Sequence, residues 1–371
     1  MADDNAALSK VGSTKTDRDT LRNQPLGNPG GSLWLGLAIG ALGGALFAFL
    51  KLPLAWMLGA MVFTTFASIS GVQISLPHWL RTSMIAILGV MIGSAFSPDL
   101  IDQLDRWAVS IAGLLVYAIL AGAMVLVYLR KVGGYDPVTA YFSSSPGGLN
   151  EMVIVGREMG GDDRIIALTQ ASRILLTVMT IPFMFRLLGD YDPPPGLLPR
   201  GASINLPMSE WLLLGGCAVI GPFLAKLIRL PAASLTGAMF LSATVHIAGW
   251  SEGSPPSILV ALAQVVLGTG VGCRFSGTAV REVVRVVRLS LGSTTLLIAS
   301  AVAAGLIMEQ ITGIPWYMLV LAYAPGGLAE MSLVALGIGQ DIAFVATHHL
   351  FRISIVVILA PLAFRLMRRG L

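Results

Sequence analysis

Two glutamates lie inside apolar segments of the chain, and both follow the same short motif. Glu151 occurs in "SSSPGGLNEM" and Glu330 occurs in "LAYAPGGLAEM". A carboxylate within an apolar segment is costly, which makes it a functional candidate by default. Such a group can bind Na⁺ together with nearby carbonyl oxygens, or it can take up and release a proton. The alternative is a structural role, in which each glutamate caps a helix or forms a salt bridge.

Basic residues follow each motif inside the next apolar segment. Arg173 and Arg352 lie deep in these segments, and each is expected to pair with the glutamate of its own half and to help accept an anionic substrate. A purely structural ion pair is the alternative. His348 and His349 are neighbours, so they point about 100° apart on a helix and do not easily bind one metal ion. We predict His349 to be a polar cavity residue, and we expect neither a metal nor a cofactor.

The residues just before each glutamate predict a break in the helix. Pro146 and Pro325 end a helix, and the two glycines after each proline let the backbone turn back or approach a ligand closely. Non-helical backbone is tolerated at membrane depth only where protein or a water-filled cavity surrounds it. The helix that starts after each turn offers free N–H groups, which attract anionic groups. Paired interrupted helices are the best sequence indication of a transporter's binding site.

The predicted site therefore consists of both turns and the polar residues around them. Ser143, Ser144 and Ser145 make the first turn the more polar of the two. No catalytic residue is predicted, and the chain is not expected to be an enzyme. The predicted substrate-binding or ion-binding residues are Ser145, Pro146, Gly147, Gly148, Asn150, Glu151, Arg173, Pro325, Gly326, Gly327, Glu330, His349 and Arg352.

The composition is that of an integral membrane protein. Of the 371 residues, 55% are hydrophobic and only 12% are charged, and the mean hydropathy is +0.79. A soluble domain carries about 25% charged residues, whereas runs such as "WAVSIAGLLVYAILAGAMVLVYL" are long enough to span a bilayer. Residues 1–32 are polar and are predicted to form a disordered cytoplasmic tail. The net charge of +4 is modest and spread over loops, so direct binding to nucleic acid is not expected.

The chain is an internal duplication. Residues 146–173 match residues 325–352, and an offset of 178–179 residues also aligns the apolar segments before them. Repeat 1 is predicted at 33–188 and repeat 2 at 211–371, with a Pro-rich linker at 189–210. Lys and Arg favour the cytoplasmic side of a membrane, and equivalent loops of the two repeats carry opposite charge. The repeats are therefore predicted to be inverted.

The predicted fold is an all-α polytopic membrane protein made of two inverted-topology repeats. Each repeat has six apolar segments, and inversion requires an odd number of crossings, so one segment does not cross. The segment with Pro-Gly-Gly is the candidate, because each of its arms reaches only ~15 Å. It is expected to be either a re-entrant hairpin or a broken helix. Ten crossings then place both chain termini on one side, and the basic residues at both ends predict that this side is the cytoplasm.

Three further patterns predict local packing. Asp162 and Asp341 precede an apolar segment and are placed to cap the helix that follows. Cys217 and Cys273 are predicted to be buried thiols, because their spacing fits neither a disulfide framework nor a metal site. Close helix packing is predicted at glycines spaced four residues apart, Gly89 with Gly93 and Gly268 with Gly272.

The motif "PGGLxEM", followed in the second half by "VATHHLFRISIVVILAPLAFRL", resembles the AbrB-duplication membrane protein family. The resemblance covers nearly everything from Leu33 onward. Members carry names such as membrane protein AbrB, regulator of AidB expression and ammonia monooxygenase. The resemblance implies a multi-pass protein of the bacterial inner membrane that is linked by name to gene regulation. The repeat layout is also similar to that of the cation:proton antiporter and anion transporter group, which implies transport.

These observations favour a secondary transporter of a small anionic or zwitterionic solute, coupled to H⁺ or Na⁺. A hairpin-bearing core would move against a scaffold. The alternative is a membrane sensor or regulator that affects gene expression indirectly. A membrane oxygenase is disfavoured, because four scattered histidines and no carboxylate-rich cluster form neither a copper site nor a facial triad. The expected partners are the lipid bilayer, a small molecule or ion and, as one option, a second copy of the chain.

Overall fold

The computed structural model describes residues 26–27, 30–187 and 206–369. The predicted tail at 1–32 lies almost entirely outside the described residues, and so does most of the predicted linker at 189–210. One boundary differs from the prediction, because a helix already begins at Met208, inside the predicted linker. The residue before it is a proline, whose fixed backbone angle suits the start of a helix.

The described chain is almost entirely helical, which confirms the all-α class. The first half contains β1 (Leu26–Gly27), α3 (Leu33–Phe49), α4 (Ala55–Ile69), β2 (Ser75–Leu76), α5 (His78–Gly93), η1 (Pro98–Gln103), α6 (Leu104–Lys131), α7 (Pro137–Ser144), α8 (Leu149–Glu158) and α9 (Asp163–Leu187). The second half contains α10 (Met208–Leu227), α11 (Ala233–Ile247), α12 (Ser257–Gly272), η2 (Cys273–Phe275), α13 (Val280–Thr312), α14 (Trp316–Tyr323), α15 (Leu328–Gly337) and α16 (Ile342–Arg369). The two short strands pair antiparallel, with Leu26 opposite Leu76.

Six helices of the described chain are long and apolar enough to cross a membrane, which confirms a polytopic membrane protein. They are α6, α9, α10, α12 extended by η2, α13 and α16. The other four predicted crossings, α3, α4, α5 and α11, are apolar helices of 15–17 residues. At 1.5 Å per residue they are about 23–26 Å long. The total of ten crossings and the sidedness of the loops stay predictions.

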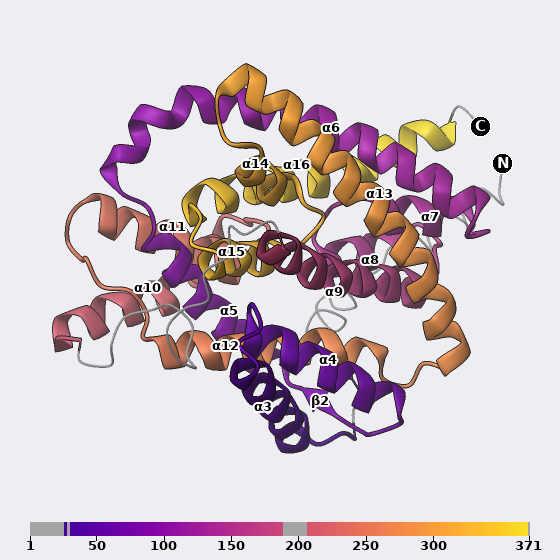
Figure 1. Cartoon of the computed structure of the whole chain (residues 1–371), viewed down its shortest axis with the longest axis horizontal. Coiled ribbons are helices and arrows are strands. Elements are labelled where there is room, and N and C mark those ends of the chain that lie inside the picture. Colours follow the sequence, from indigo (N-terminus) through magenta and orange to yellow (C-terminus); the bar gives the residue numbers. More distant parts are fainter. Residues whose placement is uncertain (1–25, 28–29, 188–205, 370–371) are drawn as a thin grey trace, which may run out of the picture.

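Helices α3–α5 and α10–α12 with η2 pack together in one layer, which we call the scaffold (Figure 1). Its two halves are joined by α5 against α11 and by α12 against α4. The glycine pairs lie at these two contacts: a Cβ added to Gly89 would stand 2.5 Å from the carbonyl oxygen of Leu235, and one added to Gly268 would meet Met57. The predicted close packing at glycines is confirmed.

Replacing Gly89 with leucine is expected to lower the midpoint of thermal unfolding in detergent. The new side chain would force α5 away from α11, and overpacking of this kind costs about 1–3 kcal/mol. Gly122 of α6 is the matched control, because a Cβ added there has nothing within 4 Å. Gly122→Leu should leave the midpoint unchanged. Equal midpoints for the two variants would show that the α5–α11 contact is not tight.

Helices α6–α9 and α13–α16 form a second body, which we call the hairpin bundle. Helices α7 and α8 run antiparallel as a hairpin: the N–H of Asp162, beyond the end of α8, donates to Oγ1 of Thr139 near the start of α7 at 2.9 Å. Phe142 lies beside Gly156 within the same hairpin. Helices α14 and α15 pack on each other in the equivalent place of the second half. Each Pro-Gly-Gly segment is thus a folded-back pair of short helices.

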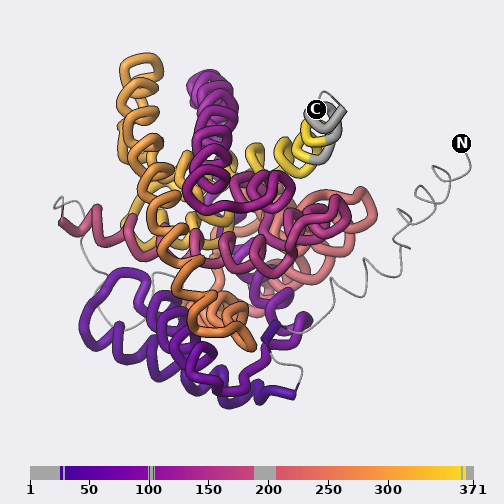
Figure 2. The backbone as a smooth tube through the Cα atoms, turned by 90° about the vertical axis from the view of Figure 1, so that its right-hand side faces the viewer, coloured from indigo at the N-terminus to yellow at the C-terminus, as the bar shows by residue number. Residues whose placement is uncertain are grey.

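The two halves repeat the same order of helices, while the described strands belong to the first half alone. In Figure 1, α6 runs from left to right and α13 runs back from the lower right to the upper left. Figure 2 shows the same two helices, purple and orange, standing above the indigo helices of the scaffold. The described non-glycine residues with positive φ also fall at equivalent turns, Lys51 and Leu54 in the first half and Arg229 and Ala232 in the second.

The predicted helix caps are confirmed in both halves. Oδ1 of Asp162 accepts the N–H of Ile165 at 3.0 Å, and Oδ1 of Asp341 accepts the N–H of Phe344 at 3.0 Å. An N-cap carboxylate satisfies a backbone donor that the first turn of a helix leaves free. The caps fix where α9 and α16 begin, and these two helices carry the buried arginines.

Candidate functional site

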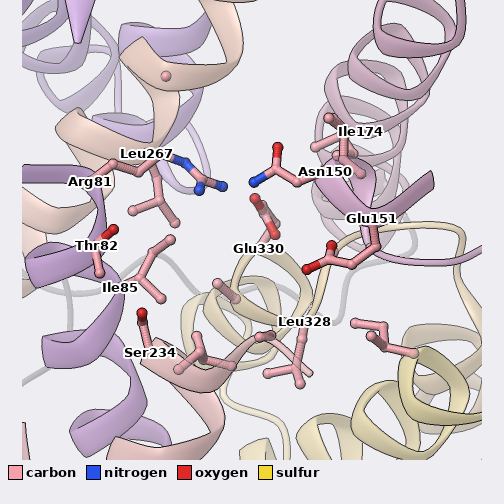
Figure 3. A pocket seen from close by; sticks show the side chains of 18 of the residues that line it. Arg81, Thr82, Ile85, Asn150, Glu151, Ile174, Ser234, Leu267, Leu328 and Glu330 are labelled. Atoms are coloured by element: carbon pink, nitrogen blue, oxygen red, sulfur yellow. The ribbon is translucent and has the colours of Figure 1, made fainter. Parts of the chain in front are cut away.

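A cavity of about 380 Å³ lies between the scaffold and the tips of both hairpins. Its scaffold wall comes from α5, α10, α11, α12 and η2, and its other wall comes from the first turns of α8 and α15. Figure 3 shows Arg81 and Thr82 on the scaffold side facing Asn150, Glu151 and Glu330 on the hairpin side. The two turns that the sequence singles out therefore meet at one place, although they are far apart in the chain.

The Pro-Gly-Gly-Leu-x-Glu-Met motif is a packed unit. In the first repeat, the carboxylate of Glu151 folds back over Gly148, and the sulfur of Met152 lies 2.9 Å from where a Cβ of residue 147 would stand. A side chain in place of either glycine would displace the glutamate or the methionine. The second repeat has the same contacts, Glu330 over Gly327 and Met331 over Gly326. The two glycines thus leave the space that the glutamate and methionine side chains occupy, and a larger residue there would move these side chains.

The position of each glutamate changes the expected role of the helix ends. Gly148 and Gly327 are the N-cap residues of α8 and α15, and neither has a side chain that could cap the helix. The carboxylates of Glu151 and Glu330 lie against these N-termini, where the helix dipole favours negative charge. The sequence predicted free N–H groups awaiting an anionic ligand there. The chain's own carboxylates occupy that place instead.

Behind the first tip, two side chains of α9 hold the broken end of α7. Nε2 of Gln170 donates to the carbonyl oxygens of Phe142 at 2.9 Å and Ser145 at 3.1 Å. Arg173 donates to Oε1 of Gln170 and lies 3.5 Å from the carbonyl of Ser145. A helix that ends at a proline leaves its last carbonyls without partners, and these donors satisfy them. The expected Arg173–Glu151 ion pair is absent from the described residues, because the arginine is used for this purpose.

The second tip is held in the same way by α16. Nε2 of His349 donates to the carbonyl oxygen of Leu321 at 3.0 Å, while its Nδ1 accepts from Arg352 at 2.9 Å. Arg352 also donates to the carbonyls of Ala324 at 2.5 Å and Gly326 at 2.6 Å. Its expected ion pair with the glutamate of its own half is likewise not formed within the described chain. His349 is therefore the counterpart of the first repeat's glutamine, with one donor and one acceptor.

Replacing His349 with glutamine is expected to be tolerated, whereas leucine is expected to destabilise the protein. Glutamine offers the same donor and acceptor that Gln170 offers in the first repeat. Leucine leaves the buried carbonyl of Leu321 without a partner, which costs about 1–3 kcal/mol. The thermal unfolding midpoints of the two variants in detergent measure the difference. If His349→Gln lowered the unfolding midpoint as much as His349→Leu, the two tips would not be equivalent.

Of the thirteen predicted site residues, five line the cavity and eight stand behind it. The lining residues are Gly148, Asn150, Glu151, Gly327 and Glu330. The residues behind it are Ser145, Pro146, Gly147, Arg173, Pro325, Gly326, His349 and Arg352. The hydroxyls of Ser144 and Ser145 donate to the carbonyl of Tyr141 at 2.9 and 2.8 Å, so these serines bond back to their own helix. His348 points away from His349, with its Nε2 at 2.6 Å from Oγ of Ser110.

Sequence reasoning missed the positive charges of the cavity. Arg81 of α5, Arg274 of η2 and Lys226 of α10 line the scaffold side. Nη2 of Arg274 donates to Oδ1 of Asn150 at 2.7 Å and so bridges the scaffold and the first hairpin. Arg81 lies one turn inside an apolar segment, and Arg274 stands where the first repeat has an alanine. Both signals were visible in the sequence, because a charge inside an apolar segment is a functional candidate.

A family model described as "Transition state regulatory protein AbrB" matches residues 56–368, which is most of the chain. The chain belongs to the AbrB family. It is 27% identical over 366 residues to the uncharacterized protein YhjN of Bacillus subtilis (strain 168), covering 90% of this chain and 92% of that one. It is 26% identical over 327 residues to a candidate regulator named AbrB from Escherichia coli (strain K12), covering 85% and 90%. The resemblance found from the motifs is confirmed.

The two halves of this AbrB-family chain differ in how tightly the scaffold packs on the hairpin bundle. In the first half, α4 packs on α9, and the side chains between the scaffold and the bundle form one buried cluster. In the second half, the equivalent side chains line a second, apolar cavity of about 480 Å³. The cluster residues are Ile69, Leu168, Ala171, Phe275 and Val286, and the residues at the equivalent positions in the cavity are Ile247, Thr347, Leu350, Phe96 and Trp107.

Proposed function

We propose that this AbrB-family protein is a secondary transporter of a small charged solute, coupled to H⁺ or Na⁺. The observation that carries the proposal is the meeting of both hairpin tips, with their two glutamates, at one polar cavity between two packed bodies. Interrupted helices that meet in this way form the substrate sites of many transporters built from repeats. In this proposal Glu151 and Glu330 carry the coupling ion, and Arg173 and Arg352 keep the tips in shape.

The difference between the two halves supports a movement of the hairpin bundle against the scaffold. Side chains at equivalent positions are packed together in one half and separated by a cavity in the other. A repeat protein can exchange these two arrangements at little cost, because each half has already adopted one of them. Exchange would open the cavity first from one side and then from the other, which is how alternating access works.

The setting of the protein belongs to the same proposal. We place it in the bacterial inner membrane as a multi-pass protein with both termini in the cytoplasm. The bilayer and the transported solute or ion are its partners, with a homodimer as one option and no direct binding to nucleic acid. It acts as a carrier and not as an enzyme, and it needs no cofactor.

Uptake into proteoliposomes tests the proposal. Purified protein is reconstituted, and a panel of labelled short carboxylates, amino acids and alkylamines is offered with a pH gradient, a Na⁺ gradient or neither. At least one solute should accumulate only when a gradient is present. Glu330→Gln and Glu151→Gln should each abolish accumulation, since a neutral amide neither titrates nor neutralises a cation.

Glu252 provides the matched control for these variants, because it is an exposed glutamate outside the cavity. Glu252→Gln should accumulate solute like the unaltered protein. If Glu330→Gln still accumulated solute fully when a gradient is present, Glu330 would not be the residue that carries the coupling ion. The absence of uptake for every solute under all gradients would remove the transporter proposal itself.

A second candidate function is indirect regulation, because the family description and the Escherichia coli relative's name both refer to a regulator. In this case the membrane protein senses a solute and acts through another protein. The cavity would then bind a ligand without passing it across the membrane. Ligand binding in detergent together with no flux in the proteoliposome experiment would favour this function.

A further inference from the structure

The walls of the first cavity carry opposite charges. The scaffold wall has the guanidinium groups of Arg81 and Arg274, and Lys226 stands exposed at its edge. The hairpin wall has the carboxylates of Glu151 and Glu330. Arg81 lies within electrostatic range of both carboxylates. The cavity is therefore polarised across its width, from the scaffold to the tips.

These charges do not neutralise one another by direct contact. Neither Glu151 nor Glu330 forms an ion pair or a hydrogen bond with any residue of the described chain. Glu330 is only 8% exposed, and its carboxylate lies over Gly327. Figure 3 shows the guanidinium of Arg81 reaching across the gap toward Asn150 and Glu330. A helix N-terminus favours these carboxylates, but a buried carboxylate with no ion pair or hydrogen bond remains costly. The gap between the two walls is therefore where a ligand's own charges would be stabilised.

The other lining groups limit the kind of ligand. The hydroxyls of Thr82 and Ser234 lie on the scaffold side of the cavity and can bind an anionic oxygen. Ile85, Leu267 and Leu328 also line the cavity, so it has room for a small apolar part of the ligand beside its charges. A cavity of about 380 Å³ lies at the low end of the range for small-molecule sites. A small molecule that carries one positive and one negative charge fits these limits.

We infer that the cavity binds a small zwitterion of the amino-acid type, with its carboxylate at Arg81 and Arg274 and its ammonium group at Glu330. This inference rests on the proposed function for the step of transport and names the substrate class of the same site. A simple anion would leave Glu330 buried without a cationic partner, and a simple amine would leave Arg81 without an anionic one. A zwitterion supplies both partners and adds no net charge to a site inside the membrane.

Matched probes test the charge requirement. For alanine, leucine and glutamate, the amino acid is compared with the acid that lacks its amino group and the amine that lacks its α-carboxylate. Binding is measured in detergent by the shift of the thermal unfolding midpoint with concentration. At least one amino acid should bind, and both of its analogues should bind at least about tenfold more weakly. An analogue that binds as tightly as its parent, or a failure of all three amino acids to bind, would overturn the inference.

Two variants test which wall holds which charge. In Arg81→Gln, only Arg274 remains to hold the carboxylate, so the amino acid should exceed its amine in affinity by a smaller factor than in the unaltered protein. In Glu330→Gln, the amino acid and its deaminated acid should bind alike. Glu252→Gln should keep the full preference for the zwitterion. The unfolding midpoint without ligand shows whether each variant is folded.

The outcomes separate this inference from the proposed function. If amino acids bind with the expected charge requirement and are not carried into proteoliposomes, the ligand class stands and transport fails. If a gradient drives the uptake of a simple carboxylate and of no amino acid, transport stands and the zwitterion assignment fails. A preference for the amino acid that Arg81→Gln leaves unchanged would place the carboxylate elsewhere and would overturn the geometry inferred here.

Discussion

Replacing Arg352 with glutamine is expected to lower stability and to abolish uptake, more than any other single change at the hairpin tips. Its side chain is only 2% exposed, and it donates to the carbonyls of Ala324 and Gly326 on both sides of Pro325. Each of these buried carbonyls would lose its donor, at about 1–3 kcal/mol apiece. The second tip would then no longer hold Glu330 at the cavity.

The equivalent change in the first repeat provides the comparison. Arg173 stands 3.5 Å from the carbonyls of Ser143 and Ser145, and Gln170 makes the shorter bonds to that helix end. Arg173→Gln should therefore lower the unfolding midpoint less than Arg352→Gln. Arg352→Lys keeps the charge but offers a single nitrogen in place of the two that reach Ala324 and Gly326, so its unfolding midpoint should lie between those of Arg173→Gln and Arg352→Gln. Equal losses for the two glutamine variants would show that the carbonyl contacts of Arg352 do not decide the stability of the second tip.

The hairpins could be predicted because their signals are local. A proline followed by two glycines breaks a helix wherever it occurs, and the length of each arm is read directly from the sequence. The duplication, the caps at Asp162 and Asp341, and the glycine contacts of Gly89 and Gly268 follow from spacing alone. Each of these features depends on residues that are close in the chain or repeated at a fixed distance.

The partners of the buried charges could not be predicted in the same way. Opposite charges suggested an ion pair between Arg352 and Glu330, but the cost of unpaired carbonyls at a helix end outweighed it. Spacing says how far apart two residues are along a helix and does not say which acceptors the neighbouring hairpin presents. Arg81 and Arg274 have no charged counterpart in the other repeat, so a comparison of the two repeats does not single them out.

The different packing of the two halves should make equivalent positions differ in their accessibility to a thiol reagent. Leu168 of α9 is buried in the closed cluster, whereas Thr347 of α16, 179 positions later, lines the apolar cavity. Cys217→Ala and Cys273→Ala first remove both native thiols. In this background, Thr347→Cys should react with N-ethylmaleimide at least about tenfold faster than Leu168→Cys. The labelling rate follows the fraction of molecules in which the new thiol is exposed. A rotation of the bundle against the scaffold would open one site as it closes the other.

The labelling ratio should therefore change when the protein works. With solute and the coupling gradient present, labelling at position 168 should rise while labelling at position 347 falls, since one movement governs both. A structural asymmetry without movement predicts a ratio that solute and gradient leave unchanged. A fall at one position without a rise at the other would mean that the ligand merely covers a side chain. Only the reciprocal change requires that each half adopts the packing of the other, and this exchange is what a carrier built from two repeats needs.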